Sequence, residues 1–240
     1  MEREHITPQG VSVFHDKNEN IHSFCLCLYV RAGSLFETKE NNGISHFFEH
    51  IVFKNIHYQM GENLYQTLDR CGLDFNASTY EEFIQFIITG APAHFEEAAE
   101  ILTGIFEPIT LPEEVIDTER KRIKAEIREE DEESSLGYFT KKIAWKNTSL
   151  ERTITGKKKT LDKIKGKQLR KFQKEVLSSN NIFFYISGNY PETAVVTVTK
   201  LMENYPLTVM KKERKNLAPV PKHFFARKPK VYVKNSKKTC

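Results

Sequence analysis

Residues 45–54 read SHFFEHIVFK and combine a helical pattern of apolar side chains with two histidines. His46 and His50 are four residues apart, so on a helix they lie about 40° apart on the same face. Imidazole nitrogens placed in this way can bind one zinc ion at about 2.0–2.1 Å each. Phe47 and Phe48 would then face the core and hold the helix against a sheet. The stretch therefore predicts a buried helix that carries a metal site.

Glu49 stands three residues after His46 and next to His50, so it projects from the same side of this helix. A carboxylate in that position can take a proton from a water molecule without being a metal ligand itself. With 8 histidines in 240 residues, the bare pattern HxxEH arises by chance in roughly three such chains per hundred. The pattern alone therefore leaves a pair of surface histidines as an open alternative.

A third ligand is expected, because catalytic zinc usually has three protein ligands and one open position. In a later predicted helix, Glu119 and Glu126 are seven residues apart, which is close to two turns, so both carboxylates face one way. Glu126 can complete the metal site, and Glu119 can accept a hydrogen bond from a ligand histidine. Spacing alone favours the plainer alternative of an acidic stripe on a solvated helix, since four further glutamates follow at 129–133.

The rest of the chain predicts a mixture of strands and helices rather than a strict alternation. Gly72 is a natural stop for a second helix, and Pro112 stands at the favoured first turn of a later one. This order predicts an α+β fold, in which a mixed, largely antiparallel sheet carries helices packed mainly on one face. The predicted strands are 11–14, 22–30, 73–79, 83–89 and 182–187, and the predicted helices are 45–54, 61–71, 93–106, 112–127, 136–145, 167–177 and 193–204.

The composition is that of an ordinary globular protein, with 39% hydrophobic and 28% charged residues. A chain of this length buries a sizeable core and needs neither a disulfide nor a metal merely to fold. The net charge of +4 is mild and does not predict nucleic-acid binding. Much of the charge lies at 156–174 and 211–215, which favours solvated helix faces over a basic surface for acidic peptides or membranes.

Cysteine usage predicts a reducing compartment. The four cysteines, Cys25, Cys27, Cys71 and Cys240, form neither a CxxC pair nor a regular framework. Cys25 and Cys27 lie two residues apart in an apolar strand, so both are expected on one face as small core residues. The first ten residues show no targeting signal, and no stretch is long enough to span a membrane. We therefore expect a soluble, cytoplasmic protein.

The segment HFFEH, followed by Phe53 and Lys54, resembles the zinc helix of the pitrilysin family, which includes insulin-degrading enzyme and the mitochondrial processing peptidase. In that family the motif HxxEH is inverted relative to thermolysin-like enzymes. The resemblance covers about Val11 to Leu207, with the motif residues in order. The matching segments are Arg31-Ala32-Gly33-Ser34, Glu37, Gly43-Ile44-Ser45, Gly72, Asn76-Ala77-Ser78-Thr79, Thr155-Gly156 and Ser187-Gly188-Asn189.

This resemblance implies a zinc-dependent endopeptidase with one Zn²⁺ per chain, held by His46, His50 and Glu126. In the family the third ligand is a glutamate about 76 residues past the second histidine, which is Glu126 here. A supporting glutamate precedes it by seven residues, which is Glu119, and Glu49 corresponds to the residue that activates a water. The resemblance thus favours the zinc site over the acidic stripe.

The resemblance also implies that a peptide substrate adds a strand beside an edge strand containing Asn76, Ala77, Ser78 and Thr79. Pairing of main chain with main chain explains how such a site cuts peptides or small unfolded polypeptides of unrelated sequence. His57 and His94 are expected to be surface histidines.

Members of the family usually carry two homologous halves that close around a chamber. Residues 1–207 would be the zinc-binding catalytic domain, and 208–240 a basic linker and the start of the strand that leads to a missing second half. Full activity is then expected to need that half or a homologous partner subunit. The alternative is a non-catalytic peptide-binding or structural subunit of a heterodimer, which zinc content would distinguish.

Overall fold

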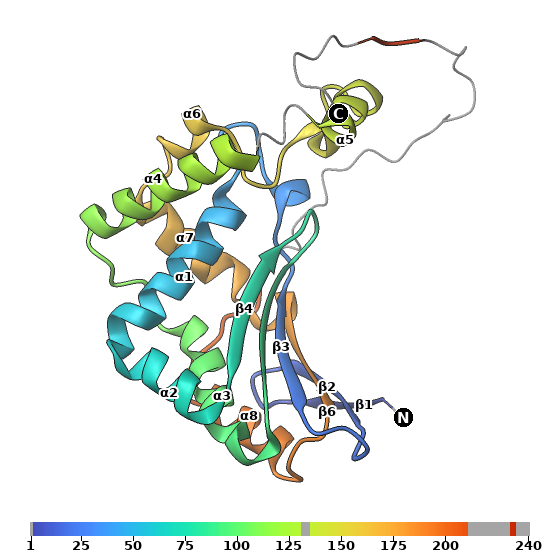
Figure 1. Cartoon of the computed structure of the whole chain (residues 1–240), viewed down its shortest axis with the longest axis vertical. Helices are drawn as coiled ribbons and strands as arrows, with labels where there is room; N and C mark the ends of the chain where they lie inside the picture. The colour runs from blue at the N-terminus through green and yellow to red at the C-terminus, as the bar shows by residue number, and fades with distance from the viewer. Residues whose placement is uncertain (1, 131–134, 211–230, 234–240) are drawn as a thin grey trace.

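The computed structural model describes residues 2–130, 135–210 and 231–233. At its centre is one six-stranded sheet in the order β1-β2-β6-β3-β5-β4, with helices covering one face (Figure 1). Neighbours β2 and β6 run parallel, and the other four neighbouring pairs are antiparallel. The predicted α+β fold with a mixed, largely antiparallel sheet is therefore confirmed. The strands are β1 (Arg3–Ile6), β2 (Ser12–Lys17), β3 (Phe24–Val30), β4 (Asp74–Thr79), β5 (Ile84–Gly90) and β6 (Ile182–Gly188).

The helices gather beside the sheet, whereas α5 lies apart near its upper end (Figure 1). The longest helices are α1, which carries HFFEH, and α4, which carries the two glutamates of the predicted site. Helix α1 contacts α2, α4 and α7 and also packs against β4 and β5. The helices are α1 (Ile44–Met60), α2 (Asn63–Cys71), α3 (Phe95–Thr103), α4 (Glu113–Glu130), α5 (Leu136–Ala144), α6 (Lys158–Leu161), α7 (Gly166–Val176) and α8 (Ala194–Met202).

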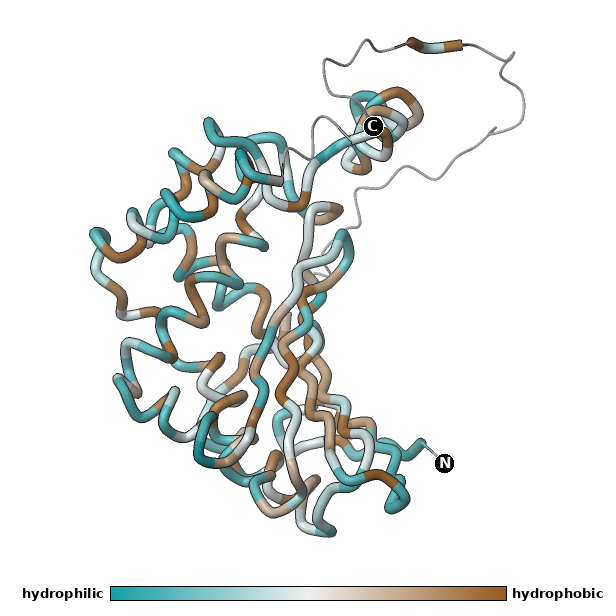
Figure 2. Tube along the Cα trace, viewed as in Figure 1, coloured by the Kyte–Doolittle hydropathy of each residue, from teal (hydrophilic) through white to brown (hydrophobic). Residues whose placement is uncertain are grey.

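The core lies between the helices and the sheet. Phe47 and Phe48 of α1 are fully buried, as their place between the histidines predicts. In β3 the side chains alternate, so Leu26 and Leu28 join this core, whereas Cys25 lies on the other side of the strand. Figure 2 shows hydrophobic residues along the central strands, where the helices pack. Burial of this surface holds α1 in a fixed position over the sheet.

The paired cysteines depart from expectation in one respect. Cys25 and Cys27 share one side of β3, as predicted, with their Sγ atoms 3.5 Å apart. That side faces away from the main core, however, and Cys25 is only partly buried while Cys27 is buried. The apolar run of β3 predicts the strand but not which of its sides the helices cover.

Three features have no counterpart in the predicted elements. Strand β1 is short and exposed, so it lacks the apolar alternation that marks a strand. Helix α6 has four residues and lies within the basic run. Its lysines give it no apolar periodicity, so the sequence does not indicate a helix there. The parallel pairing of β2 with β6 joins segments that are about 170 residues apart, and no local sequence pattern predicts such a contact.

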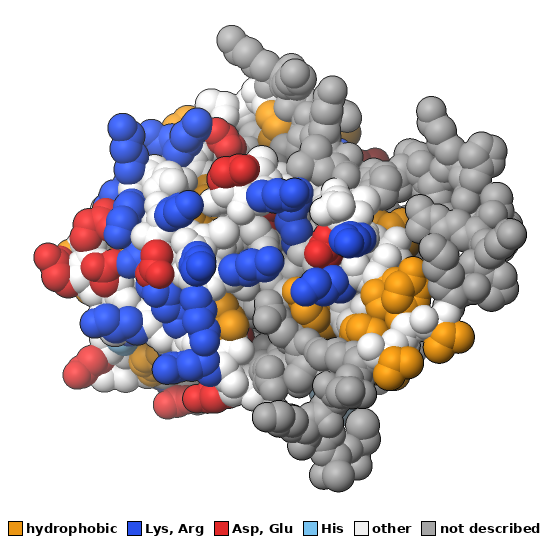
Figure 3. Space-filling model, turned by 90° about the horizontal axis from the view of Figure 1, so that it is seen from above, with side chains coloured by type: hydrophobic (Ala, Val, Ile, Leu, Met, Phe, Trp, Pro, Cys, Tyr) orange, Lys and Arg blue, Asp and Glu red, His pale blue; other side chains and the backbone are white. Residues whose placement is uncertain are grey.

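Lysine and arginine side chains gather on the face shown in Figure 3, with acidic side chains among them. Lys124 pairs with Asp162, and Arg170 lies 3.7 Å from Glu113. These pairs fit the interpretation of solvated helix faces. In the part of the chain that the structure describes, no helix has the length and apolar character needed to cross a membrane.

The predicted division at 207 and 208 stays a prediction. Most of the segment assigned to the linker and to the next strand, 211–230 and 234–240, lies outside the described residues, as does Cys240.

Candidate metal centre

A buried carboxylate caps the start of the helix that carries both histidines. Glu37 is fully buried just before α1. Its Oε1 accepts a hydrogen bond from the Ser45 N–H at 2.9 Å, and its Oε2 accepts one from the Gly43 N–H at 2.8 Å. The Asn42 side chain donates to the same Oε2 at 2.9 Å. The carboxylate thus satisfies donors at the start of α1, where the helix dipole favours negative charge, and fixes the helix immediately before His46.

A later loop is fastened to the same helix start by close backbone contact. Gly43 has φ +96°, and a Cβ there would lie 2.7 Å from the Thr155 carbonyl oxygen. A Cβ on Gly156 would lie 2.4 Å from the Asn42 carbonyl oxygen. Two glycines are therefore required where these segments cross. The Asn42 side chain also donates to the Thr153 carbonyl at 2.9 Å, so the loop at 153–156 is held beside the site.

Three side chains converge between α1 and α4, and we call His46, His50 and Glu126 the first cluster. His46 Nε2 lies 3.5 Å from Glu126 Oε1, and His50 Nε2 lies 3.5 Å from Glu126 Oε2. These distances exceed the usual N–H···O range of about 2.7–3.2 Å. They match the separation of about 3.4 Å between nitrogen and oxygen ligands of a tetrahedral zinc ion. The donor types and their spacing therefore fit zinc.

Glu119 lies behind the first cluster and is almost fully buried. Its Oε2 is 3.5 Å from His50 Nδ1. The adjacent imidazole of His50 lowers the pKa of Glu119, and the adjacent imidazole of His46 lowers the pKa of Glu126. Both groups are therefore carboxylates at neutral pH. An ionised Glu119 favours the proton on Nδ1 of His50, which leaves the lone pair of Nε2 available to bind a metal ion beside Glu126.

The direction of both glutamates follows from how α4 is anchored. Ile116 and Ile123 are fully buried on its core side. Arg120 donates from Nε to the Leu161 carbonyl at 3.0 Å and from Nη2 to the Ile164 carbonyl at 2.7 Å. With its register set in this way, the helix presents Glu119 and Glu126 together to α1, as their spacing of two turns predicts.

Glu49 takes no part in the first cluster but bonds across to the sheet. The Thr79 hydroxyl donates to Glu49 Oε2. Thr79 ends β4, the edge strand, so this bond places the carboxylate between the cluster and the edge of the sheet. The sequence singled out both residues but gave no sign of the bond between them, because it joins a helix to a strand 30 residues away.

Two clefts flank these side chains. One, of ≈ 750 Å³, is bordered by the first cluster, by Glu49 and by Ala77, Ser78 and Thr79 of β4. The other, of ≈ 360 Å³, is bordered by Glu49 and His50 and by a more apolar wall that includes Phe53, Leu68 and Phe75. Together they form an open trough that follows the edge strand past the donors.

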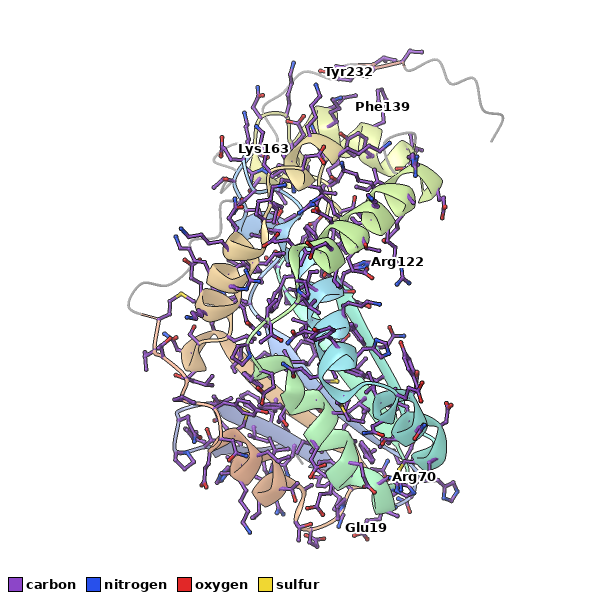
Figure 4. The ribbon with its side chains drawn as sticks, turned by 90° about the vertical axis from the view of Figure 1, so that its left-hand side faces the viewer. Glu19, Arg70, Arg122, Phe139, Lys163 and Tyr232 are labelled. Atoms are coloured by element: carbon purple, nitrogen blue, oxygen red, sulfur yellow. The ribbon has the colours of Figure 1, made fainter. Side chains whose placement is uncertain are left out.

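Arg122 borders both clefts and was not singled out by the sequence. It lies on α4, where Figure 4 labels it, and its Nη1 is 3.8 Å from Glu119 Oε1. Its side chain is 75% exposed. In sequence it stands in a run of alternating charges, so nothing there distinguishes it from a solvated residue.

The four predicted substrate-binding residues lie in β4, as expected for an edge strand. Their side chains alternate, with Ala77 and Thr79 partly buried and Asn76 and Ser78 exposed. Among the described strands, β4 pairs only with β5, so its outer edge has no partner there. The backbone of this strand is therefore placed to pair with an extended peptide, and all four residues border the trough.

Comparison with known proteins agrees with this geometry. Residues 12–158 match the family described as insulinase (peptidase family M16). The chain belongs to this family. It is 26% identical, over 198 residues, to an uncharacterized zinc protease of Bacillus subtilis, covering 82% of this chain and 48% of that protein. It is 31% identical, over 156 residues, to the beta subunit of the rat mitochondrial-processing peptidase, covering 64% of this chain and 32% of that protein.

Solved structures of other proteins share the fold. A protease from Helicobacter pylori superimposes with a TM-score of 0.79 at 20% identity, over 90% of this chain and 53% of that chain. A peptidase M16 inactive domain from Pseudomonas fluorescens superimposes with a TM-score of 0.78 at 14% identity, over 91% of this chain and 54% of that chain. The chain spans about half the length of these proteins. Because the fold occurs in a protease and in an inactive domain alike, the side chains must decide the question of activity.

Proposed function

We propose that this chain is the catalytic half of a zinc-dependent endopeptidase that cuts peptides or small unfolded polypeptides. The observation that carries the proposal is the meeting of three metal donors, His46, His50 and Glu126, with a separate carboxylate, Glu49, beside an open strand edge. A purely structural subunit would need neither the donor spacing nor the carboxylate. One Zn²⁺ would be bound at the first cluster.

The residues of the site divide the work between them. When bound, zinc supplies Lewis acidity, which polarises a peptide carbonyl and makes water more acidic. Glu49 takes the proton of the attacking water and delivers it to the leaving amine. Thr79 holds the Glu49 carboxylate through its hydroxyl, and Glu119 holds the imidazole of His50 in the tautomer that keeps Nε2 available.

The substrate would bind as an extended strand along β4. Main-chain groups of 76–79 would pair with those of the peptide, which positions a scissile bond over the first cluster. Such pairing reads backbone rather than sequence, so specificity comes from the clefts on either side of the donors. We propose that a homologous second half or partner subunit closes the trough, and that this chain alone turns over slowly. A cytoplasmic location remains part of the proposal.

The decisive experiment replaces the base and leaves the donors. For Glu49→Gln we expect wild-type zinc content and peptide hydrolysis lower by about 10²–10⁴-fold, because the amide cannot accept the proton. The measurement is cleavage of a pool of quenched fluorescent peptides by the zinc-loaded chain, with metal content determined on the same samples. Glu62→Gln, an exposed glutamate just before α2, is the matched control and should behave as wild type.

Two outcomes would contradict this assignment. Unchanged turnover in a metal-loaded Glu49→Gln variant would remove the base from its role. A zinc-loaded wild-type chain that binds extended peptides but never cleaves them, alone or with a homologous half, would favour the non-catalytic subunit instead.

A further inference from the structure

A second group of metal-ligating side chains lies away from the trough, and we call Cys71, His94 and Glu97 the second cluster. Cys71 is the last residue of α2, His94 directly precedes α3, and Glu97 lies in the first turn of α3. None of the three borders the two clefts of the first cluster. Figure 4 labels Arg70, the neighbour of Cys71, at the lower end of the molecule, far from the label of Arg122.

The donor atoms of the second cluster have the spacing of a metal site. Cys71 Sγ lies 4.0 Å from Glu97 Oε1, and His94 Nδ1 lies 3.5 Å from the same oxygen. All three donors lie within 4.8 Å of one another. In a tetrahedral zinc site the sulfur–oxygen and nitrogen–oxygen separations are about 3.6 Å and 3.4 Å. The 3.5 Å between His94 and Glu97 equals the nitrogen–oxygen distances of the first cluster.

One donor is buried without a hydrogen bond. His94 Nδ1 is shielded from solvent, and within the described residues it has no hydrogen-bond partner, although the side chain as a whole is 37% exposed. Leaving such a nitrogen without a partner is unfavourable, so buried nitrogens are almost always satisfied by a hydrogen bond or an ion. The nearby Cys71 is buried as well, so a shielded nitrogen and a buried sulfur lie within 4.8 Å of each other and of a carboxylate oxygen.

We propose that Cys71, His94 and Glu97 bind a second divalent ion, zinc or a similar metal with affinity for sulfur. Thiolate, imidazole and carboxylate are the ligands that zinc takes in proteins, whereas magnesium and calcium prefer oxygen alone. Three protein donors leave the fourth position to water. The two sites differ in that only the second contains a sulfur ligand.

The position of the second cluster indicates what the ion does. Cys71 lies three residues before the start of the β4–β5 hairpin, and His94 and Glu97 lie four and seven residues after its end. An ion held by all three ties the two ends of this hairpin together. Because β4 is the edge strand of the trough, the ion stabilises the strand that borders the first cluster, without taking part in chemistry.

Cobalt titration of the full chain tests this site, because a cobalt–thiolate bond gives an intense near-ultraviolet charge-transfer band that histidine and carboxylate ligands do not give. Wild type should bind two Co²⁺, one of which produces the band. Cys71→Ser should lose the band and one ion, whereas Glu126→Gln should lose one ion and keep the band. Replacing Cys25 and Cys27 by serine is the matched control and should keep both ions and the band.

Substitution of buried Cys71 can disturb folding, so His94→Gln and Glu97→Gln provide a second measurement at partly exposed positions. Each should weaken the sulfur-containing site at least 10-fold while circular dichroism stays unchanged. The proposal fails if wild type binds a single Co²⁺ without the band, or if the band disappears with Cys25 and Cys27 instead of Cys71. It also fails if Glu97→Gln leaves the affinity unchanged.

Discussion

The two clusters have similar donor spacing but very different surroundings. The first cluster stands on the two longest helices, α1 and α4, and the buried Glu37 and Glu119 support it. The second cluster stands on the end of the nine-residue α2 and on the start of α3. The first borders an open trough and has Glu49 beside it, whereas Cys71, His94 and Glu97 line neither of the two clefts of that trough.

This difference shows that donor spacing alone defines a metal site and not a catalytic one. Hydrolysis needs a base next to the ion and room for a peptide, and the first cluster has Glu49 and the trough beside it. The second cluster lies at the two ends of the β4–β5 hairpin, where an ion would act as a structural tie.

Glu126→Gln should separate the clusters most strongly. It removes one of three donors from the first cluster, so zinc binding there should weaken by more than about 100-fold, beyond the effect of losing a supporting residue. Peptidase activity should disappear with the metal. Zinc titration by calorimetry, alongside the peptide assay, measures both, and Glu114→Gln at an exposed position of the same helix is the control. Full activity in Glu126→Gln would break the comparison, because the reaction would then not depend on the first cluster.

Glu119→Gln should have a smaller effect at the same site. The amide keeps the shape of the side chain but loses the charge that holds the proton on Nδ1 of His50. Zinc affinity at the first cluster should fall by about 10–100-fold, while the sulfur-containing site keeps its affinity. Paired cobalt titrations of both sites in one sample give this ratio directly. Equal weakening of both sites would mean that the substitution acts by disturbing the fold.

The sequence predicts most of the first cluster because helical geometry is local. Spacings of four and seven residues place His46 with His50 and Glu119 with Glu126, and the structure brings both pairs together. The spacings alone do not show that the two helices meet. That expectation came from the resemblance to the family. The helices and the central strands follow in the same way from apolar periodicity and from stops such as Gly72.

Long-range contacts could not be predicted in this way. Three examples are the bond from Thr79 to Glu49, the cap from Glu37 and the pairing of β2 with β6. In each case, the sequence pattern of one segment gives no information about the segment that it contacts. The second cluster also depends on contacts between segments that are distant in the sequence. His94 is partly exposed, as expected for a surface histidine, but only the fold shows its buried Nδ1 beside Cys71.

Glu37→Gln, at the start of α1, should have a smaller effect than either substitution in α4. Glu37 accepts three hydrogen bonds in a fully buried place, and two come from backbone N–H groups of Gly43 and Ser45. In Glu37→Gln an amide group would face one of these donors and the negative charge at the helix start would be lost. The free energy of unfolding should fall by about 1–3 kcal/mol.

Urea unfolding with a chelator present measures this loss without any contribution from bound metal. Glu40→Gln, at an exposed position three residues later, is the control and should leave stability unchanged. Below the unfolding transition, the Glu37 variant should bind zinc more weakly at the first cluster, because His46 lies in the first turn of the loosened helix, while cobalt binding at Cys71 stays as it was. If the variant loses stability but both sites keep their affinities, Glu37 supports the fold and not the position of the histidines.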